Sequence, residues 1–434
     1  MSRTSRSFPI FDHKKLKSAL LDWTRDYTRV VWLDSNQHSD EHGTYDIIVA
    51  VSRQTNGSVF EADSIDKVQY FVDEKKDWLF GFITYDFKNN LEDLKSENLD
   101  VLGFPELYFF CPEKIILIKN DKINFRYLEQ FREEIEDDFL NLTKEENVKQ
   151  ELPSNGVHIQ MRIHKDAYFE KVNTMLTHIH RGDIYEANFC QEFYAANSSI
   201  DPWSIYWSLN RISEPPFATF LRLEDKFLLC ASPERYLKRR GRRVLSQPIK
   251  GTARRDSNSV KDEILKNELE VNPKERAENI MITDLVRNDL SKSAVKGSVQ
   301  VKELCKVYTY KQVHQMVSTV MCEVSQETSS VELIKETFPM GSMTGAPKVS
   351  AMKLIEELEE SKRGLYSGTV GYFNPEGNFD FNVVIRSILY NASKKYISYS
   401  VGSAITSNSN PEKEYEECLI KAKAMRSVLE GKNS

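Results

Sequence analysis

The sequence lacks a long apolar segment. No hydrophobic run approaches the roughly 18 residues that a membrane-spanning helix needs. The first residues, Met1 to Ser7, also lack the apolar core of a secretory signal. These absences predict a cytoplasmic protein.

Cysteine is scarce, with six residues in a chain of 434, and none forms a C-x-x-C pair. Most of the six lie in apolar segments, which is typical of reduced core residues in a cytosolic protein and argues against a zinc site. His178 and His180 fall in a helical pattern, where their side chains diverge, so they do not indicate a metal site either.

An excess of positive charge is missing too. The chain has 59 Lys and Arg residues against 65 Asp and Glu residues, a net charge of -6, and no basic stripe. These features argue against nucleic acid as a partner. Hydrophobic residues at 40% and charged residues at 29% are typical of a soluble globular protein, and the length suggests two or three domains.

One polar segment divides the chain. Residues Asn141–Gly156 contain few apolar side chains and include Pro153 and Gly156, a composition typical of a linker. We therefore predict a β-rich N-terminal region over residues 1–145, a linker over 146–156 and a mixed α/β region over 157–434.

Hydrophobic periodicity and turn residues predict the main elements of both regions. One predicted helix carries Tyr168 to Ile179 on a single apolar face and ends at Gly182. Further helices are expected over residues 275–290, 349–360 and 412–429, and strands over residues 30–33, 45–51, 78–85, 115–118, 218–223, 226–230, 242–246, 369–373, 379–389 and 396–405.

Lys250 is a candidate nucleophile. It follows Glu234 by sixteen positions, and the strand predicted between them would let both side chains face one pocket. A free lysine titrates near about 10.4 and attacks only when neutral. Burial and the nearby cations Arg254 and Arg255 would lower its pKa, and Glu234 could assist a leaving group. A surface lysine beside a glycine turn is the alternative.

Two predicted helices carry carboxylates at helical spacing. Glu275 and Glu278 share one face of the first, and Glu414 and Glu417 share one face of the last. If these faces meet, they form an oxygen site suited to Mg2+, which takes a few carboxylates, several waters and substrate oxygens. Solvated acidic faces are the more common reason for such pairs.

The loop Gly341–Lys348 leads into a predicted helix and could hold an anion. Its free backbone N–H groups, including that of Gly345, and the Thr344 hydroxyl are suitable donors for a carboxylate. The spacing to Lys348 is not that of a phosphate-binding loop. A helix-entry turn without a ligand fits the same sequence.

Arg386 lies in an apolar segment, where a charge needs a partner. An internal Asp or Glu is the default expectation, and a substrate carboxylate held together with Tyr372 is the alternative. Gly402 and Ser403, on the next strand, would let a ligand or a neighbouring strand approach closely. His314 could act as an acid or base, although a lone histidine in an apolar run is more often structural.

Taken in order, these segments resemble the chorismate-utilising enzymes, and most closely the large subunits, or component I, of aminodeoxychorismate synthases. The resemblance is strong over residues 160–430 and weaker in the N-terminal part. It is carried by Gly182–Asn188, Ser232–Arg235, Pro248–Thr252, Arg276–Leu290, Gly341–Lys348, Gly371–Tyr372, Ile385–Ser387 and Glu414–Glu417.

The fold that the resemblance implies is α/β, of the α+β type. Large antiparallel sheets would form a two-layered sandwich surrounded by helices, with the N-terminal and C-terminal regions interleaved. The segment Trp32–Ser35 resembles the part that forms a tryptophan pocket in anthranilate synthases.

The resemblance also implies a reaction. Anthranilate synthases typically have alanine at the position of Lys250, and aminodeoxychorismate synthases have lysine there. Lys250 would attack C2 of chorismate while the C4 hydroxyl leaves with help from Glu234, and ammonia would then displace the lysine. The product, 4-amino-4-deoxychorismate, leads to 4-aminobenzoate and folate. Anthranilate synthase component I is the alternative, and a scaffold without activity is a third reading.

Motif matching assigns the other site residues. Glu278 and Glu417 resemble Mg2+ ligands, and Glu275 and Glu414 resemble partners that act through water. The implied substrate-binding residues are Thr252, Thr344, Gly345, Tyr372, Arg386, Gly402 and Ser403.

Three positions depart from the family pattern. Gln315 stands where a histidine is common, Ser403 with Ala404 replaces a glycine-rich stretch, and Glu186 stands where glutamine is usual. The chain also has no Gly-x-Cys-x-Gly glutaminase motif. A separate amidotransferase subunit would therefore supply ammonia from glutamine, which predicts a heterodimer.

Overall fold

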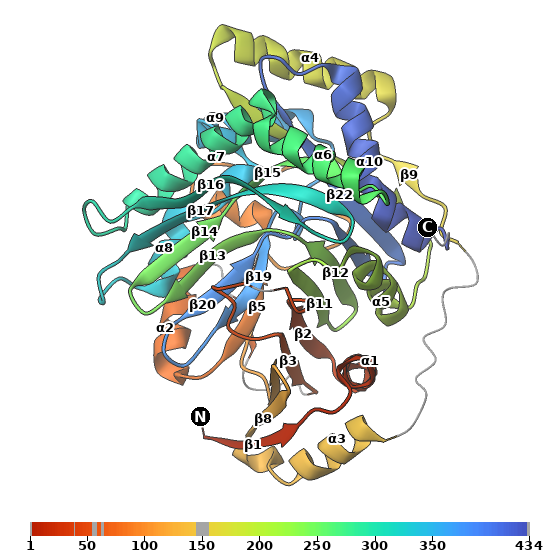
Figure 1. Ribbon diagram of the computed structural model, residues 1–434, viewed down its shortest axis with the longest axis vertical. Coiled ribbons are helices and arrows are strands. Elements are labelled where there is room, and N and C mark those ends of the chain that lie inside the picture. Colours follow the sequence, from red (N-terminus) through yellow and green to blue (C-terminus); the bar gives the residue numbers. More distant parts are fainter. Residues whose placement is uncertain (1, 39, 54–58, 62–64, 145–155, 432–434) are drawn as a thin grey trace.

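The computed structural model describes residues 2–38, 40–53, 59–61, 65–144 and 156–431 (Figure 1). Within these ranges, two antiparallel sheets of 12 and 10 strands form the body of the protein. No helix in these ranges combines the length and hydrophobicity that crossing a membrane requires.

The first sheet draws strands from the whole length of the chain. It contains β1 (Arg3–Pro9), β2 (Arg29–Asp34), β3 (Ile47–Ser52), β7 (Lys114–Lys119), β8 (Lys122–Leu128), β9 (Gln160–Met161), β10 (Glu186–Ala195), β11 (Phe217–Leu223), β12 (Lys226–Ser232), β18 (Gly345–Ala346), β21 (Ser387–Asn391) and β22 (Tyr396–Ile405). Their order is β1-β8-β7-β3-β2-β11-β12-β21-β22-β10-β18, with β9 beside β10.

The second sheet holds the remaining described strands. These are β4 (Val59–Glu61), β5 (Leu79–Ile83), β6 (Leu107–Phe110), β13 (Arg235–Arg240), β14 (Arg243–Gln247), β15 (Ile249–Arg254), β16 (Gln300–Thr309), β17 (Val313–Glu323), β19 (Thr369–Phe373) and β20 (Phe379–Asn382). Their order is β15-β17-β14-β13-β20-β19-β5-β6-β4, with β16 beside β17.

Strands from the N-terminal and C-terminal parts of the chain pair within both sheets. β2 pairs with β11 in the first sheet, and β5 pairs with β19 in the second. Neither part could therefore complete its sheets without the other. Residues 146–155 of the predicted linker lie outside the described residues, so the boundary there stays a prediction.

The first sheet is buried on both faces. Val31 and Ala50 point into a core cluster shared with the second sheet, and their neighbours Trp32 and Val49 point into a cluster shared with helices. This alternation follows from the period of two along a strand. The predicted two-layered sandwich with surrounding helices is confirmed.

Helices cover the sheets and gather at one end, in the upper part of Figure 1, where α4, α6, α7, α9 and α10 lie. The helices are α1 (His13–Trp23), α2 (Ile65–Lys75), α3 (Glu134–Thr143), α4 (Lys165–Arg181), α5 (Pro202–Ser213), α6 (Ser259–Val271), α7 (Pro273–Ser291), α8 (Ser330–Thr337), α9 (Lys348–Leu358) and α10 (Pro411–Leu429). The helix predicted to end at Gly182 is α4, and Gly182 caps it with a φ of 83°.

The strand predicted over residues 379–389 is wrong in its middle. β20 ends at Asn382 and β21 begins at Ser387, because the chain crosses here from the second sheet to the first. Val383 and Val384 are buried in the cluster between the sheets, so their hydrophobicity reflects the crossing and not a strand. Arg386 has a φ of 53°, in the left-handed region, which breaks the extended backbone.

Candidate active site

Lys250 lies at an irregular point of β15. The register of β15 against β17 shifts between Ile249 and Thr252, and Gly251 has a φ of 84°, which glycine adopts without strain. The side chain of Lys250 is 11% exposed. Its Nζ donates a hydrogen bond of 2.8 Å to Oε1 of Glu186, at the start of β10.

Carboxylates surround this ammonium group. Burial acts to lower the pKa of Lys250, but Glu186, followed by Glu278 and Glu234, outweighs burial and raises the pKa above its ordinary value. Lys250 is therefore a cation in the resting site and must lose a proton before it can attack.

The prediction that neighbouring arginines lower the pKa of Lys250 is wrong. Arg254 is exposed. Nε of Arg255 donates hydrogen bonds of 2.9 Å to both carboxylate oxygens of Asp262. Solvent exposure of Arg254 and the pairing of Arg255 with Asp262 keep both charges from acting on Lys250, which adjacency in the sequence does not reveal.

Glu234 lies between β12 and β13 with 3% of its surface exposed. Burial raises its pKa to about 7, although a hydrogen bond of 2.7 Å from Oγ of Ser342 and the charge of Lys250 act in the opposite direction. A carboxyl group with this pKa can hold and release a proton near neutral pH, as a general acid must. The structure thus brings the predicted nucleophile and the predicted acid into one site.

The four predicted metal-site glutamates come from α7 and α10. Burial raises the pKa of Glu278 to about 7. Burial, followed by the charge of Glu417, also raises the pKa of Glu275. The pKa of Glu417 is lowered, because the ammonium of Lys421, 2.6 Å away, helps to outweigh burial. Glu414 is 2% exposed.

Two oxygens of these glutamates, Oε1 of Glu278 and Oε2 of Glu414, are buried and receive no hydrogen bond from the described part of the chain. Nζ of Lys274 is 3.7 Å from Oε1 of Glu278 and 3.6 Å from Oε1 of Glu414, too far for hydrogen bonds. Within the described residues, no three acidic, histidine or cysteine groups are close enough to hold a metal ion by themselves. Buried carboxylate oxygens that lack a hydrogen-bond donor fit a cation, in this case one that takes most of its ligands from water and substrate.

Arg386 lines a small cavity together with Pro233, Gln315 and Lys421. In the part of the chain that the structure describes, its side chain has no hydrogen bond or ion pair, so the internal Asp or Glu expected by default is not found. Burial lowers the pKa of Arg386. A guanidinium that lacks a protein partner is suited to a ligand carboxylate.

Tyr366, and not Tyr372, is the tyrosine that contributes to the electrostatic surroundings of Arg386. Tyr366 and Glu417 both act against the effect of burial on the pKa of Arg386, and the hydroxyl of Tyr366 is 3.8 Å from Sγ of Cys190. The ring of Tyr372 packs against Trp78 at a centroid distance of 5.3 Å and lines a different cavity. The structure therefore does not bring Tyr372 to Arg386 as predicted.

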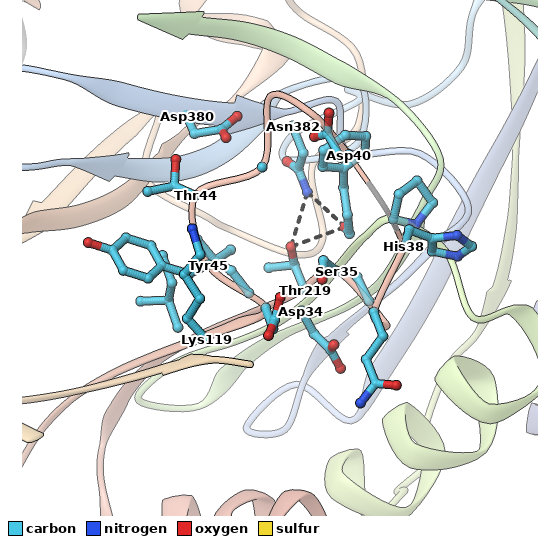
Figure 2. Close-up of a pocket in the computed structure, with 18 of the residues that line it drawn as sticks. Asp34, Ser35, His38, Asp40, Thr44, Tyr45, Lys119, Thr219, Asp380 and Asn382 are labelled. Carbon is cyan, nitrogen blue, oxygen red and sulfur yellow. Dashed lines mark hydrogen bonds between the residues drawn. The ribbon is translucent and has the colours of Figure 1, made fainter. Parts of the chain in front are cut away.

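The cavity that Tyr372 lines has a volume of about 490 Å³ and lies between strands of both sheets. Figure 2 shows Asp34, Thr219 and Asn382 around it, with a hydrogen bond of 3.0 Å from Nδ2 of Asn382 to Oγ1 of Thr219. Leu33 to Ser35, at the end of β2, also line this cavity. It is separate from the site around Lys250.

The loop Gly341–Lys348 is held by its own hydrogen bonds. Thr344 is fully buried, and its hydroxyl donates to the carbonyl of Met340 at 3.1 Å, so that proton is not free for a carboxylate. A Cβ on Gly345 would lie 2.1 Å from the carbonyl oxygen of Glu186. The glycine is therefore needed for the close approach of β18 to β10.

Gln315 and Thr252 connect β17 and β15 beside the bulge. Nε2 of Gln315 donates to the carbonyl of Gly251 at 2.6 Å, and its Oε1 accepts from Oγ1 of Thr252 at 3.2 Å. Both side chains thus help to hold the backbone that carries Lys250.

His314 points away from this site. It is buried, and its ring nitrogens lie 3.0 Å from Oγ1 of Thr309 and 3.0 Å from Oδ1 of Asp262. These contacts account for both nitrogens, as expected for a structural histidine.

Gly402 and Ser403 have close neighbours inside the protein. A Cβ on Gly402 would lie 2.5 Å from Sγ of Cys190 on β10, and the Gly402 carbonyl accepts a hydrogen bond of 2.9 Å from Nζ of Lys421. The hydroxyl of Ser403 is 3.4 Å from that of Tyr168. The structure therefore shows close packing of Gly402 against a neighbouring strand, which the sequence offered as the alternative to close approach of a ligand.

Comparison with known proteins identifies the family. The family described as chorismate binding enzyme matches residues 28–427. The chain belongs to the chorismate binding enzymes.

Relatives in this family cover most of the chain. An anthranilate synthase component I-like protein of Synechocystis is 34% identical over 82% of this chain and 73% of its own. Aminodeoxychorismate synthase component 1 of Bacillus subtilis is 32% identical over 81% of this chain and 76% of its own.

Solved structures show the same fold. Anthranilate synthase component I from Streptococcus pneumoniae superposes with a TM-score of 0.74 at 23% identity, over 98% of this chain and 92% of that one. The isochorismate synthase MenF from Escherichia coli superposes with a TM-score of 0.76 at 17% identity, over 99% of this chain and 95% of that one.

Two residues near the candidate site, Lys421 and Tyr366, are not among the residues predicted from the sequence. Lys421 follows Glu417 by four positions on α10, a spacing that predicts an ion pair. Tyr366 gives no comparable signal, because it comes near Cys190 and Arg386 only in the folded chain.

Proposed function

We propose that this chorismate-binding enzyme is the synthase subunit of an aminodeoxychorismate synthase. It converts chorismate and ammonia into 4-amino-4-deoxychorismate, which leads to 4-aminobenzoate and folate. The observation that carries the proposal is a buried lysine, Lys250, in one site with Glu234, a carboxyl group whose pKa is about 7. The relative from Bacillus subtilis named aminodeoxychorismate synthase component 1 supports it.

In the first displacement, Lys250 acts as the nucleophile. After its ammonium has lost a proton, the nitrogen forms a bond to C2 of the ring, the ring double bonds shift and the bond from C4 to oxygen breaks. Glu234 gives its proton to the departing hydroxyl, which leaves as water.

In the second displacement, ammonia forms a bond to C4. The double bonds shift back, and the nitrogen of Lys250 leaves C2 with the electron pair of the broken bond. The new ammonium at C4 returns one proton to Glu234, so the net reaction exchanges a hydroxyl for an amino group and releases water. Two displacements place nitrogen on C4, where a single attack on C2 would not.

The carboxylates of chorismate need cations. Arg386 would hold one of them through its unpartnered guanidinium. Glu278 and Glu417 would hold Mg2+, with Glu275 and Glu414 acting through waters. The buried oxygens of Glu278 and Glu414 that lack a hydrogen-bond donor support this assignment. When bound, the ion would neutralise the negative charge of the ring carboxylate.

Ammonia would come from a partner. We propose a separate glutamine amidotransferase subunit and a heterodimer in the cytoplasm. Glutamine-dependent turnover only when that partner is added would support this arrangement, and glutamine hydrolysis by this chain alone would contradict it.

One assay tests the proposed function. The chain is incubated with chorismate, ammonium and Mg2+, and the product is identified by mass. Aminodeoxychorismate is the expected product. Anthranilate with pyruvate would instead identify an anthranilate synthase, and unchanged chorismate would indicate a binding protein without this activity.

A further inference from the structure

Glu186 is the group in direct contact with the nitrogen that the proposed reaction uses. It is 1% exposed, and its Oε1 accepts the hydrogen bond of 2.8 Å from Nζ of Lys250. Its other oxygen, Oε2, is buried and accepts no hydrogen bond from any residue that the structure describes. A buried carboxylate with one oxygen on a lysine and one without a partner is costly to maintain for structure alone.

The backbone of Glu186 is held on two sides. Glu186 pairs with Ala346 of β18, and the next residue, Ala187, pairs with Ile405 of β22. The N–H of Tyr185 donates to the carbonyl of Ala346 at 2.7 Å. Because these bonds fix the strand, the carboxylate stays at hydrogen-bonding distance from Lys250.

The attack by Lys250 needs a base that can reach its ammonium group. The ammonium of Lys250 cannot form a new bond until it loses a proton. Glu234 is not suited to take it, because Glu234 supplies a proton to the leaving hydroxyl in the same displacement and is bound by Ser342. Glu278 acts on the charge of Lys250, but no hydrogen bond joins the two in the described residues.

We propose that Glu186 is the catalytic base that takes the proton from Lys250 before the lysine attacks the ring. This inference rests on the proposed function and adds a residue to it. One N–H bond of the Lys250 ammonium breaks and its proton moves to a Glu186 oxygen, leaving a neutral amine with a free electron pair. After the second displacement releases that amine, Glu186 returns the proton, so the pair is restored at the end of the cycle.

A catalytic role and a purely structural role for Glu186 predict opposite changes in the rate of Lys250 attack when the charge of Glu186 is removed. If Glu186 only holds Lys250 as a cation, removing its charge makes the amine easier to deprotonate and speeds its attack. If Glu186 is the base, removing its charge slows the attack at neutral pH, because the proton must then leave to water. The sign of the change therefore distinguishes the two roles.

The experiment measures how fast Lys250 becomes bonded to the substrate. The full-length protein and Glu186→Gln are mixed with chorismate and Mg2+ without ammonia, quenched with acid, and analysed by intact mass. We expect adduct formation to slow by about 100-fold in Glu186→Gln at neutral pH, within the usual range for general base catalysis. Glu192→Gln, on the same strand, is the control, because Glu192 bonds Tyr396 and Ser398 instead, and it should keep the normal rate.

Each outcome decides between the two roles. Adduct formation in Glu186→Gln at or above the normal rate would overturn the inference. If Glu186→Gln does not fold, as judged by circular dichroism, Glu186→Ala with added formate replaces it. Recovery of adduct formation with formate supports a base, and no recovery overturns it. Absence of both adduct and product in the unchanged protein would instead refute the proposed function.

Discussion

Two buried cations in this protein have opposite surroundings. Arg235, beside the cavity in Figure 2, donates to Asp380 at 2.9 Å and to Asp40 at 2.6 Å. Among the described residues, Lys250 has one hydrogen bond, to Glu186, and Glu278 and Glu234 act on it through their charge. The first cation is fully engaged by the protein, and the second is not.

The carboxylates around the two cations differ in the same way. Asp380 accepts from both Arg235 and Lys238, whereas Glu186 and Glu278 each keep a buried oxygen without a donor. A completed hydrogen-bond network stabilises the fold, and an incomplete one costs stability that a ligand, an ion or an ordered water can offset. The residues around Arg235 are therefore expected to stabilise the fold, and those around Lys250 are expected to bind a ligand or take part in a reaction.

The largest effect should come from removing the nucleophile. Lys250→Ala should lower aminodeoxychorismate formation by on the order of 1,000-fold or more, because the covalent route is lost. Product formation is measured by mass, and circular dichroism checks the fold. Full retention of aminodeoxychorismate formation would show that Lys250 is not covalently involved.

The next largest effect concerns the acid. Activity that needs protonated Glu234 should fall as pH rises through about 7, the pKa of this buried carboxyl group. Glu234→Gln should slow adduct formation by about 100-fold or more and remove that pH dependence. Rates measured from pH 6 to pH 9 in both proteins test this. If the rate of Glu234→Gln still falls as pH rises through about 7, a group other than Glu234 causes the pH dependence.

Changes around Arg235 should lower the free energy of unfolding and leave the rate of the reaction at Lys250 unaffected. Asp380→Ala leaves Arg235 and Lys238 without a shared partner and should lower the free energy of unfolding by about 3–5 kcal/mol. Urea unfolding measures this loss. The folded fraction should keep its rate of adduct formation, and a loss of rate without a loss of stability would contradict the division of roles.

The smallest effect is a gain in stability. The pKa of Glu278 is raised from 4.5 to about 7, so its ionisation opposes folding above pH 4.5 and fully so above pH 7. Glu278→Gln should therefore stabilise the protein at pH 8 by about 2–3 kcal/mol and have no such effect at pH 4. Thermal unfolding at both pH values measures the difference.

The same variant sharpens the metal assignment. Mg2+ should raise the melting temperature of the unchanged protein at pH 8, because binding favours the folded state, and should do so less in Glu278→Gln. An equal shift in both proteins would place the ion elsewhere.

Regular patterns made much of the fold predictable. The predicted helix that ends at Gly182 is α4. The segment predicted over residues 396–405 is β22 with the same bounds, and the segment predicted over 218–223 is β11, which begins one residue earlier at Phe217. The segment around Arg386 was not predictable, because burial at a crossing between sheets gives the same apolar run as a strand. Local periodicity does not distinguish them.

The site was predictable in its residue types and less so in its electrostatics. The sequence offers Lys250 and Glu234 as a candidate nucleophile and a candidate acid, and the structure places both in one site. The raised pKa of Lys250 depends on Glu186 and Glu278, which reach it from other strands and helices. Charges that meet only after folding leave no local pattern in the sequence.

The most direct test is the mass of the protein during turnover. Rapid acid quenching with chorismate present should reveal a protein heavier by chorismate minus water, and peptide mapping should locate the added mass on Lys250. The proposed mechanism requires this adduct to form before aminodeoxychorismate is released. If aminodeoxychorismate accumulates while the mass of the protein never changes, the covalent mechanism is contradicted.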